Sequence, residues 1–218
     1  MKPRTTYGWL GAAALAFFVF LRITRELFEG ELGKGDSSIL MEVAKSRSPW
    51  LTIAVVDITA LGSVTIVTLF TALALTILLR MGDRMGALQL LASSMGAGVL
   101  ILGVKQFVER ARPEVAPQLV AATGFSYPSG HSLSSTALYL TLAIVASRHL
   151  RRSGDRLGVF AGAGAVILAV AASRVYLGVH YLTDVASGMA LGAGWSLLLA
   201  GLFGRFWRHE KVLVVDGY

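Results

Sequence analysis

The sequence contains no cysteine and few charged residues, which make up 15% of its 218 positions. Without cysteine the chain forms no disulfide and offers no thiolate, and its redox compartment cannot be inferred. The sparse charges leave long uncharged blocks, and hydrophobic residues reach 55%, against about 45–50% in ordinary soluble domains. The composition therefore predicts an integral membrane protein with a single domain over residues 1–218.

Acidic residues are the scarcer charge, because 13 Asp and Glu stand against 20 Lys and Arg, for a formal net charge of +7 at pH 7. In a membrane protein this excess is typical of anchoring charges on the cytoplasmic side. The sequence also lacks a nucleic-acid-binding motif, an internal repeat and a low-complexity tract. We expect the bilayer as the main partner, no nucleic acid and no obligate protein partner.

Six apolar segments are long enough to cross a bilayer, which takes about 17–25 residues of helix. The chain is therefore expected to be an all-α, polytopic membrane protein. The first segment follows Lys2 and Arg4, as a signal peptide would, but it ends in bulky residues and Arg22, so a retained helix is favoured. The expected spans are 6–24, 54–79, 86–107, 132–148, 157–175 and 184–204.

Lysines and arginines orient these spans, because cytoplasmic loops carry the excess of both residues. With a cytoplasmic N-terminus, 11 of the 20 lie in the cytoplasm and nine outside, and three of the nine belong to the motifs below. We therefore expect a plasma (inner) membrane protein with both termini in the cytoplasm. The segment from Ser37 to Trp50 is expected to be an interfacial helix on the outer leaflet or a solvated loop.

Two glycine pairs, Gly158-x3-Gly162 and Gly188-x3-Gly192, have the small-x3-small spacing typical of close helix packing. We expect both pairs to pack helices together within the chain. His149 lies in a basic segment and is expected to face lipid headgroups, as is His209 in the basic tail.

The first of three polar motifs is K-x6-R-P, from Lys105 to Pro113. Residues seven apart on a helix differ by only about 20° in direction, so Lys105 and Arg112 are expected to project from one face toward one anion. Pro113 is expected to stop the helix. Taken alone, the motif is more typical of cations that extend to lipid headgroups.

The second motif is P-S-G-H, from Pro128 to His131, at the expected start of the fourth span. A helix start offers unpaired backbone N–H groups, which suit a phosphate. Gly130 lets a ligand approach the backbone closely. The Ser129 hydroxyl is expected to cap the helix, bind an oxyanion, or both.

The third motif is S-R-x5-H-x3-D, from Ser173 to Asp184. His180 and Asp184 are four apart, so in a helical turn the carboxylate accepts the imidazole Nδ1–H and leaves Nε2 free to attack. Arg174 offers a planar fork for phosphate oxygens, and a plain ion pair between Arg174 and Asp184 is the alternative. The expected topology puts all three motifs at the outer face, as a single site requires.

Together the three motifs resemble the signature motifs of the type-2 phosphatidic acid phosphatase superfamily, which includes lipid phosphate phosphatases and undecaprenyl pyrophosphate and phosphatidylglycerophosphate phosphatases. The resemblance implies a metal-independent phosphatase without cofactors. It implies that His180 attacks phosphorus, that Asp184 orients His180, and that His131 protonates the leaving group. The phosphoryl oxygens would be held by Lys105, Arg112, Ser129, Gly130 and Arg174.

The resemblance further implies a lipid phosphate substrate, with undecaprenyl pyrophosphate, phosphatidylglycerophosphate or phosphatidic acid expected. A phosphotransferase of the same fold, passing phosphate to an acceptor lipid, remains open. So does an anion or lipid-phosphate transporter with a basic outer vestibule, although a transporter needs charges along its crossing path.

Overall fold

A computed structural model of the chain describes residues 3–215, without the side chains of 3–5, 33–34 and 205–215. Within this range the chain forms eight α-helices and no strand, as expected for an all-α protein. The helices are α1 (Pro3–Phe28), α2 (Gly33–Lys45), α3 (Pro49–Ala60), α4 (Val64–Arg80), α5 (Arg84–Val108), α6 (Gly130–His149), α7 (Ser153–Tyr176) and α8 (Leu182–Val215).

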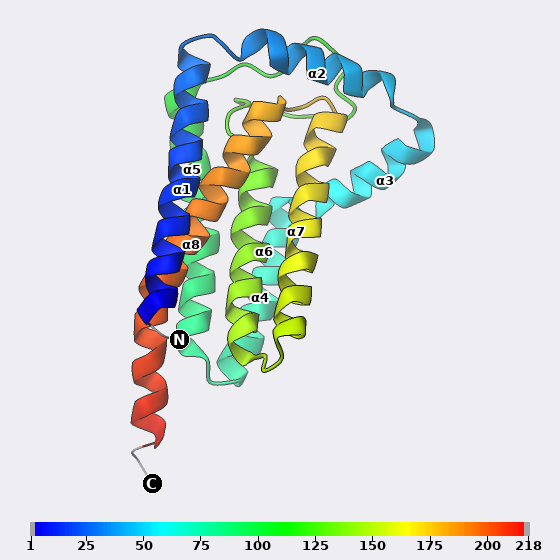
Figure 1. Ribbon diagram of the computed structural model, residues 1–218. Coiled ribbons are helices and arrows are strands. Elements are labelled where there is room, and N and C mark those ends of the chain that lie inside the picture. The colour runs from blue at the N-terminus through cyan, green and yellow to red at the C-terminus, as the bar shows by residue number, and fades with distance from the viewer. Residues whose placement is uncertain (1–2, 216–218) are drawn as a thin grey trace.

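The long helices run side by side in a bundle, and α2 lies across one end of it (Figure 1). The start of α1 and the end of α8 lie at the opposite end. Four of the described helices are long and apolar enough to cross a membrane, and the bent pair α3–α4 would add a fifth. The chain is therefore an integral membrane protein.

The second expected span, 54–79, is not one helix. α3 ends at Ala60, α4 begins at Val64, and their axes differ by 46°. The break fits closely against its neighbours, because a Cβ on Gly62 would lie 2.6 Å from Val170 Cγ1. The Tyr139 hydroxyl donates to the Leu61 carbonyl at 2.9 Å, so α6 fixes the bend.

The fourth expected span, 132–148, corresponds to α6, which does not reach the hydropathy of a membrane span. α6 packs against α4, α5, α7 and α8, so neighbouring helices surround it. Its interior hydroxyls bond within the bundle, as Thr136 does to the Ser132 carbonyl at 2.7 Å and Thr141 to Ser93 at 2.9 Å. A helix covered on so many sides needs little apolar surface of its own.

The two glycine pairs differ in their surroundings. A Cβ on Gly188 or Gly192 would lie 2.7 Å from the carbonyl oxygen of Ser129 or Leu133, so α8 packs closely on α6 as expected. Among the described residues, nothing lies within 4 Å of a Cβ built on Gly158 or Gly162, and the packing expected for that pair is wrong.

The segment from Ser37 to Trp50 forms most of helix α2, so the helical alternative is the correct one. α2 is docked on the bundle, because Leu40 is fully buried against Ala171, Val175 and Val185. Asp36, in the first turn of α2, is only 3% exposed. α2 therefore covers the end of the bundle where α5 and α7 stop.

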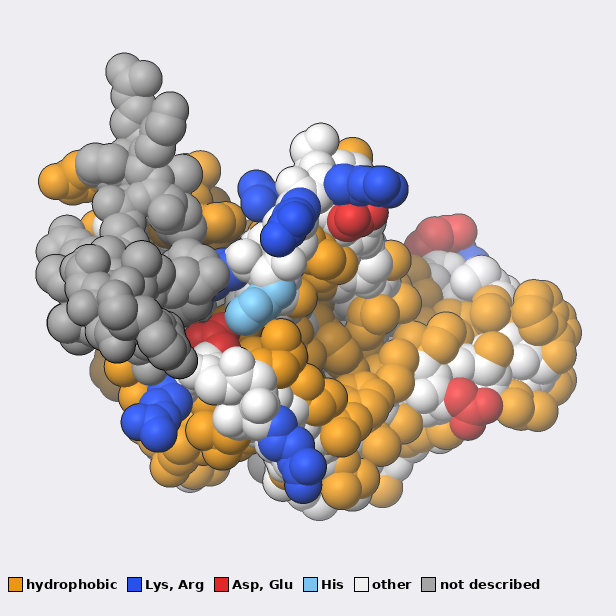
Figure 2. Space-filling model, turned by 90° about the horizontal axis from the view of Figure 1, so that it is seen from below, with side chains coloured by type: hydrophobic (Ala, Val, Ile, Leu, Met, Phe, Trp, Pro, Cys, Tyr) orange, Lys and Arg blue, Asp and Glu red, His pale blue; other side chains and the backbone are white. Residues whose placement is uncertain are grey.

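The opposite end of the bundle is rich in basic side chains (Figure 2). It carries the short connections after α4 and α6, with exposed arginines at Arg80, Arg84, Arg151 and Arg152. His149 is exposed at this end, and its Nε2 lies 2.8 Å from Asp83 Oδ2. The side chain of His209 lies outside the described residues.

Candidate active site

The three polar motifs meet at the end of the bundle that α2 covers (Figure 1). The first lies at the end of α5 and in the chain that follows, and the second begins α6. The third starts in the last turn of α7 and ends in the first turn of α8. Residues about 80 positions apart along the chain therefore form one polar cluster.

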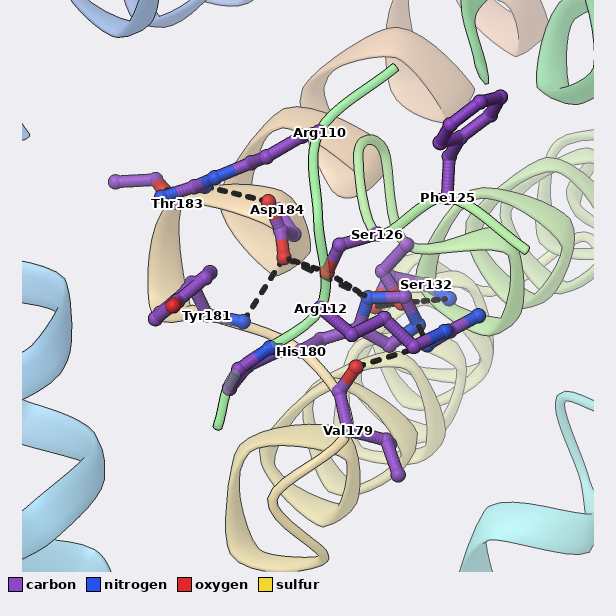
Figure 3. Close-up of polar contacts among 12 residues, drawn as sticks. Arg110, Arg112, Phe125, Ser126, Ser132, Val179, His180, Tyr181, Thr183 and Asp184 are labelled. Carbon is purple, nitrogen blue, oxygen red and sulfur yellow. Dashed lines mark hydrogen bonds and ion pairs between the residues drawn. The ribbon is translucent and has the colours of Figure 1, made fainter. Parts of the chain in front are cut away.

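His180 and Asp184 lie together, but a third side chain comes between them (Figure 3). His180 Nδ1 is 3.6 Å from Asp184 Oδ2, longer than the direct hydrogen bond that was expected. The Ser126 hydroxyl lies 3.3 Å from Nδ1 and donates to Oδ2 at 2.5 Å. Because that hydroxyl has one proton, and gives it to Asp184, its oxygen accepts from Nδ1–H.

This arrangement fixes the tautomer of His180. Its Nε2 lies 3.4 Å from Arg112 Nη1, and a guanidinium only donates, so Nε2 carries the free lone pair. His180 is 2% exposed, and burial lowers its pKa to about 4 against the opposing effect of Asp184. The ring is therefore neutral at pH 7, with Nε2 as its unprotonated nitrogen.

The other oxygen of Asp184 is held by Arg110. Arg110 Nη1 donates to Asp184 Oδ1 at 2.6 Å, and its Nη2 donates to Asp36 Oδ2 at 2.7 Å. Asp184 Oδ2 also accepts the Tyr181 backbone N–H at 2.9 Å, as a carboxylate in the first turn of a helix can. Asp184 is thus paired with Arg110, and the alternative ion pair with Arg174 does not form.

Lys105 and Arg112 both reach the site, but not from one helix face. α5 ends at Val108, and Glu109 follows in the left-handed conformation with φ 49°. A left-handed residue at the end of a helix stops it, so the helix ends well before Pro113, and Arg112 lies in the loop that follows. The expectation of a continuous helix through the K-x6-R-P motif is wrong, although the two cations still converge.

Arg112 holds the loops around the site together. It donates to the carbonyls of Gly124, Thr123 and Val179 at 2.9, 2.8 and 2.8 Å. Burial lowers the pKa of Arg112, although nearby Asp184 opposes the shift. Lys105 donates to the carbonyl of Phe125. Both cations therefore donate hydrogen bonds to the loop that leads into the P-S-G-H motif.

Arg174 has a free donor inside the site. Its Nη1 donates to Thr59 Oγ1 at 2.8 Å, which ties α7 to the end of α3. Its Nε is buried and finds no hydrogen-bond partner among the described residues. An unpaired guanidinium N–H in an enclosed position is costly unless an anion completes it.

The P-S-G-H motif opens α6 as expected. Ser129 is the N-cap, and its hydroxyl oxygen accepts from the backbone N–H and the hydroxyl of Ser132, at 3.5 and 3.0 Å. Gly130 is the first residue of the helix and has no close neighbour on its α-carbon. His131 follows, half-buried and within electrostatic range of His180 and the three cations of the motifs.

Three residues of the cluster are absent from the sequence prediction: Asp36, Arg110 and Ser126. Arg110 lies two positions before Arg112 and was counted only as a charge outside the membrane. Two cations two apart on extended chain are a signal that both serve one site. Ser126 and Asp36 leave no comparable signal, since a single serine in a loop and a single acid in a short helix are common.

Several proteins similar in sequence to this chain are phosphatases by name. Phosphatidylglycerophosphatase B of Bacillus subtilis is 33% identical over 89% of this chain and 96% of its own length. Decaprenylphosphoryl-5-phosphoribose phosphatase of Mycobacterium tuberculosis is 34% identical over 55% of this chain and 63% of its own. Lipid A 1-phosphatase of Rhizobium johnstonii is 32% identical over 50% and 44%.

Two solved structures are similar. The transmembrane PAP2-type phosphatidylglycerolphosphate phosphatase of Bacillus subtilis superimposes with a TM-score of 0.83 at 29% identity, covering 88% of this chain and 96% of that one. Aquifex aeolicus LpxE shares the fold, with a TM-score of 0.58 at 22% identity over 74% and 92%. The model of the PAP2 superfamily matches residues 86–208, which include all three motifs. The chain belongs to the PAP2 superfamily.

Proposed function

We propose that this chain hydrolyses a phosphate monoester or pyrophosphate of a membrane lipid through a phosphohistidine on His180. The observation that carries the proposal is the orientation of the His180 ring and the position of its proton. Its Nδ1 side is engaged by Ser126, and its Nε2 lone pair points toward the cations. A neutral, oriented imidazole beside fixed positive charges is suited to attack phosphorus.

The reaction runs in two displacements. His180 Nε2 forms a bond to phosphorus while the bond to the lipid oxygen, or to the inner phosphate, breaks, and His131 gives its proton to the leaving oxygen. Water then attacks phosphorus and gives a proton to His131. The P–N bond breaks, its electron pair returns to Nε2, and inorganic phosphate leaves.

The phosphoryl oxygens are proposed to bind Lys105, Arg112 and Arg174, with the Ser129 hydroxyl and the Gly130 N–H. The free Nε of Arg174 supports this assignment, because it lacks a partner that a phosphate would supply. Hydrogen bonds to charged groups are worth about 1.5–3 kcal/mol each. Three fixed cations provide the charge that a metal ion provides in kinases, so we propose a metal-independent reaction.

An apolar groove supports a lipid substrate. It has a volume of about 540 Å³ and lies between α4 and α5, with Thr71, Met95 and Gly98 among its lining residues. Ile101 also lines it, and lies 3.7 Å from a Cβ built on Gly130, so the groove approaches the start of α6. A lipid tail in this groove would place its headgroup beside the motifs.

The names of the relatives guide the choice of substrate. By their names, these three relatives act on phosphatidylglycerophosphate, on a decaprenylphosphoryl sugar phosphate and on lipid A. We propose phosphatidylglycerophosphate or phosphatidic acid and undecaprenyl pyrophosphate as the first candidates for this chain. Transfer of the phosphate to an acceptor lipid would use the same intermediate, with a hydroxyl in place of water.

We also propose six spans, with α3–α4 as one and α6 as the sixth, in a plasma (inner) membrane. Both termini would then be cytoplasmic and the site would face outward, which agrees with the arginine-rich end in Figure 2.

The chain lacks cysteine, so single cysteines report sidedness cleanly. An impermeant thiol reagent should label Glu114→Cys in intact cells and leave Ser153→Cys unlabelled. The reverse pattern would invert the topology.

The decisive experiment measures phosphate release by the purified protein from a panel of lipids: phosphatidylglycerophosphate, phosphatidic acid, diacylglycerol pyrophosphate, undecaprenyl pyrophosphate and lipid A. We expect activity in EDTA, inhibition by orthovanadate, and complete loss in His180→Ala. His149→Gln, at the other end of the bundle, is the matched control and should keep activity. Normal turnover by His180→Ala would refute the nucleophile, and loss in EDTA would refute the metal-independent reaction.

A transporter is the candidate of another class. The motif cations gather at one end of the bundle, and the side chains that the structure describes form no charged path through it, which favours the phosphatase. Uptake of a labelled lipid phosphate into vesicles, with no release of inorganic phosphate, would favour transport instead.

A further inference from the structure

Asp184 is unusually well fixed for a residue whose proposed partner is one histidine. Its Oδ1 accepts from Arg110 at 2.6 Å. Its Oδ2 accepts from the Ser126 hydroxyl at 2.5 Å and from the Tyr181 N–H at 2.9 Å. With both oxygens occupied, the carboxylate cannot rotate, and the edge that faces His180 is set by groups that are not signature residues of the motifs.

Arg110 is itself fixed between two carboxylates, that of Asp184 (Figure 3) and that of Asp36. Its Nη2 donates to Asp36 Oδ2 at 2.7 Å, and Nη1 also donates to Thr183 Oγ1 at 2.8 Å. Its guanidinium carbon lies 4.2 Å from the centre of the Tyr181 ring, a cation–π contact. The two carboxylates raise the pKa of Arg110 in spite of its burial, so it is charged at any working pH.

Asp36 joins this cluster from a separate helix. Its Oδ1 accepts the backbone N–H of Thr183 at 3.1 Å, and its Oδ2 accepts the Thr183 hydroxyl. Thr183 lies in the first turn of α8, where backbone N–H groups lack partners within the helix. α2 thus caps the helix that carries Asp184, and the same carboxylate holds the arginine that Asp184 binds.

The charges of Asp184, Arg110 and Asp36 together affect how well a positive imidazole is stabilised. Arg110 alone would cancel the charge of Asp184. With Asp36 present, the group of two carboxylates and one guanidinium carries one net negative charge on the Nδ1 side of His180, opposite the cations near Nε2. The imidazole becomes positive when Nε2 bonds to phosphorus and Nδ1 keeps its proton, so that net charge stabilises the intermediate and the transition state before it.

We propose that Asp36 and Arg110 are positioning residues for the reaction, through which α2 sets the orientation and the charge of the Asp184–His180 pair. The proposal rests on the proposed phosphatase function. It assigns to α2, which lies outside the region matched by the family model, a part in the chemistry. Neither residue is among those proposed to hold the phosphoryl oxygens, so their loss should affect turnover and not binding.

The test compares Asp36→Asn, which keeps the shape and an acceptor oxygen for the Thr183 N–H, with Glu42→Gln. Glu42 is also an acid on α2, but it is exposed and pairs only with Lys45. We expect Asp36→Asn to lower kcat about 10- to 100-fold, as is typical for residues that orient a reacting group through another. KM should change little, the thermal midpoint should fall because buried Arg110 loses one of its two carboxylates, and kcat is therefore measured well below that midpoint. Glu42→Gln should match wild type in all three.

Asp36→Glu, which restores the charge, should recover part of the lost kcat. Arg110→Met combined with Asp36→Asn should lose less than the product of the two single losses, since the net charge beside His180 returns to its original value. A kcat for Asp36→Asn within twofold of wild type, a loss confined to KM, or independent effects in the double variant would each overturn the proposal.

The activity of the wild-type protein distinguishes a failure of the proposed function from a failure of the role proposed for α2. If it releases no phosphate from any lipid of the panel, the proposed function fails and this proposal fails with it. If wild type is active and His180→Ala is inactive while Asp36→Asn is unaffected, the phosphatase stands and only the role of α2 is refuted.

Discussion

Ser126→Ala is the most informative single change at the site, because it removes one hydroxyl that joins two reacting groups. Ser126 accepts from His180 Nδ1 and donates to Asp184 Oδ2. Its removal leaves those two atoms 3.6 Å apart, too far for a good hydrogen bond. The backbone N–H of Ser126 still donates to the Arg110 carbonyl at 2.7 Å, so the loop stays in place.

The size of the effect follows from the charge on the ring. Before reaction the bond from Nδ1–H to Ser126 joins neutral groups and is long, so its loss hardly affects substrate binding. As Nε2 bonds to phosphorus, the ring becomes positive, and a hydrogen bond from a charged donor is worth about 1.5–3 kcal/mol. Loss of that bond corresponds to a fall in kcat of about 10- to 150-fold, since about 1.4 kcal/mol is tenfold.

The assay is the initial rate of phosphate release in detergent micelles, with kcat and KM measured separately. Ser135→Ala is the matched control, because Ser135 is also fully buried and its hydroxyl bonds only to the Ser132 carbonyl within α6. We expect a lower kcat and an unchanged KM for Ser126→Ala alone. If Ser126→Ala keeps kcat within twofold of wild type, the hydroxyl does not link His180 to Asp184 and the reasoning fails.

Three further predictions concern packing, pH and the groove. Gly188→Ala should lower the thermal midpoint, since its Cβ would meet the Ser129 carbonyl at 2.7 Å; Gly158→Ala, with open space around it, should not lower it. The folded pKa of His180, about 4, lies below the unfolded value of about 6.5, so the unfolded chain takes up the proton first. Stability should therefore fall as pH drops from about 6.5 to 4, and a thermal melt of His180→Gln should show a smaller fall over that window. Gly98→Phe should raise KM for a long-chain lipid phosphate but not for a short-chain one, and equal effects on both would refute the groove as a tail site.

The sequence predicted the membrane class and the motif cluster well, because both depend on residue types at short spacing. Long apolar segments identify spans, and the short spacing of H-x3-D brings His180 and Asp184 near each other. Lys105 and Arg112 do converge as expected, but the reason given for their convergence was wrong. A helical phase relation was assumed through Glu109, whose left-handed conformation depends on its tertiary setting and not on its residue type.

The supporting residues of the site were less accessible to prediction. Arg110 had been assigned to topology, since a cation outside the membrane has an ordinary explanation. Its pairing with Asp36 spans 74 positions of sequence and depends on how α2 docks. The bend after Ala60 was missed for a similar reason, because Gly62 and Ser63 interrupt an apolar segment too briefly to divide it by hydropathy.

The burial of α6 has a consequence for how the protein enters the membrane. The helix that begins with Gly130 and His131 carries Ser132, Ser135 and Thr136 on surfaces that only its neighbours cover. Two of those neighbours, α7 and α8, follow it in the chain. During synthesis α6 would therefore expose hydroxyls to lipid until α7 and α8 arrive. The site forms only as the last helices close around α6, so a chain that stops short of α8 has neither the His180–Asp184 pair nor a stable place for His131.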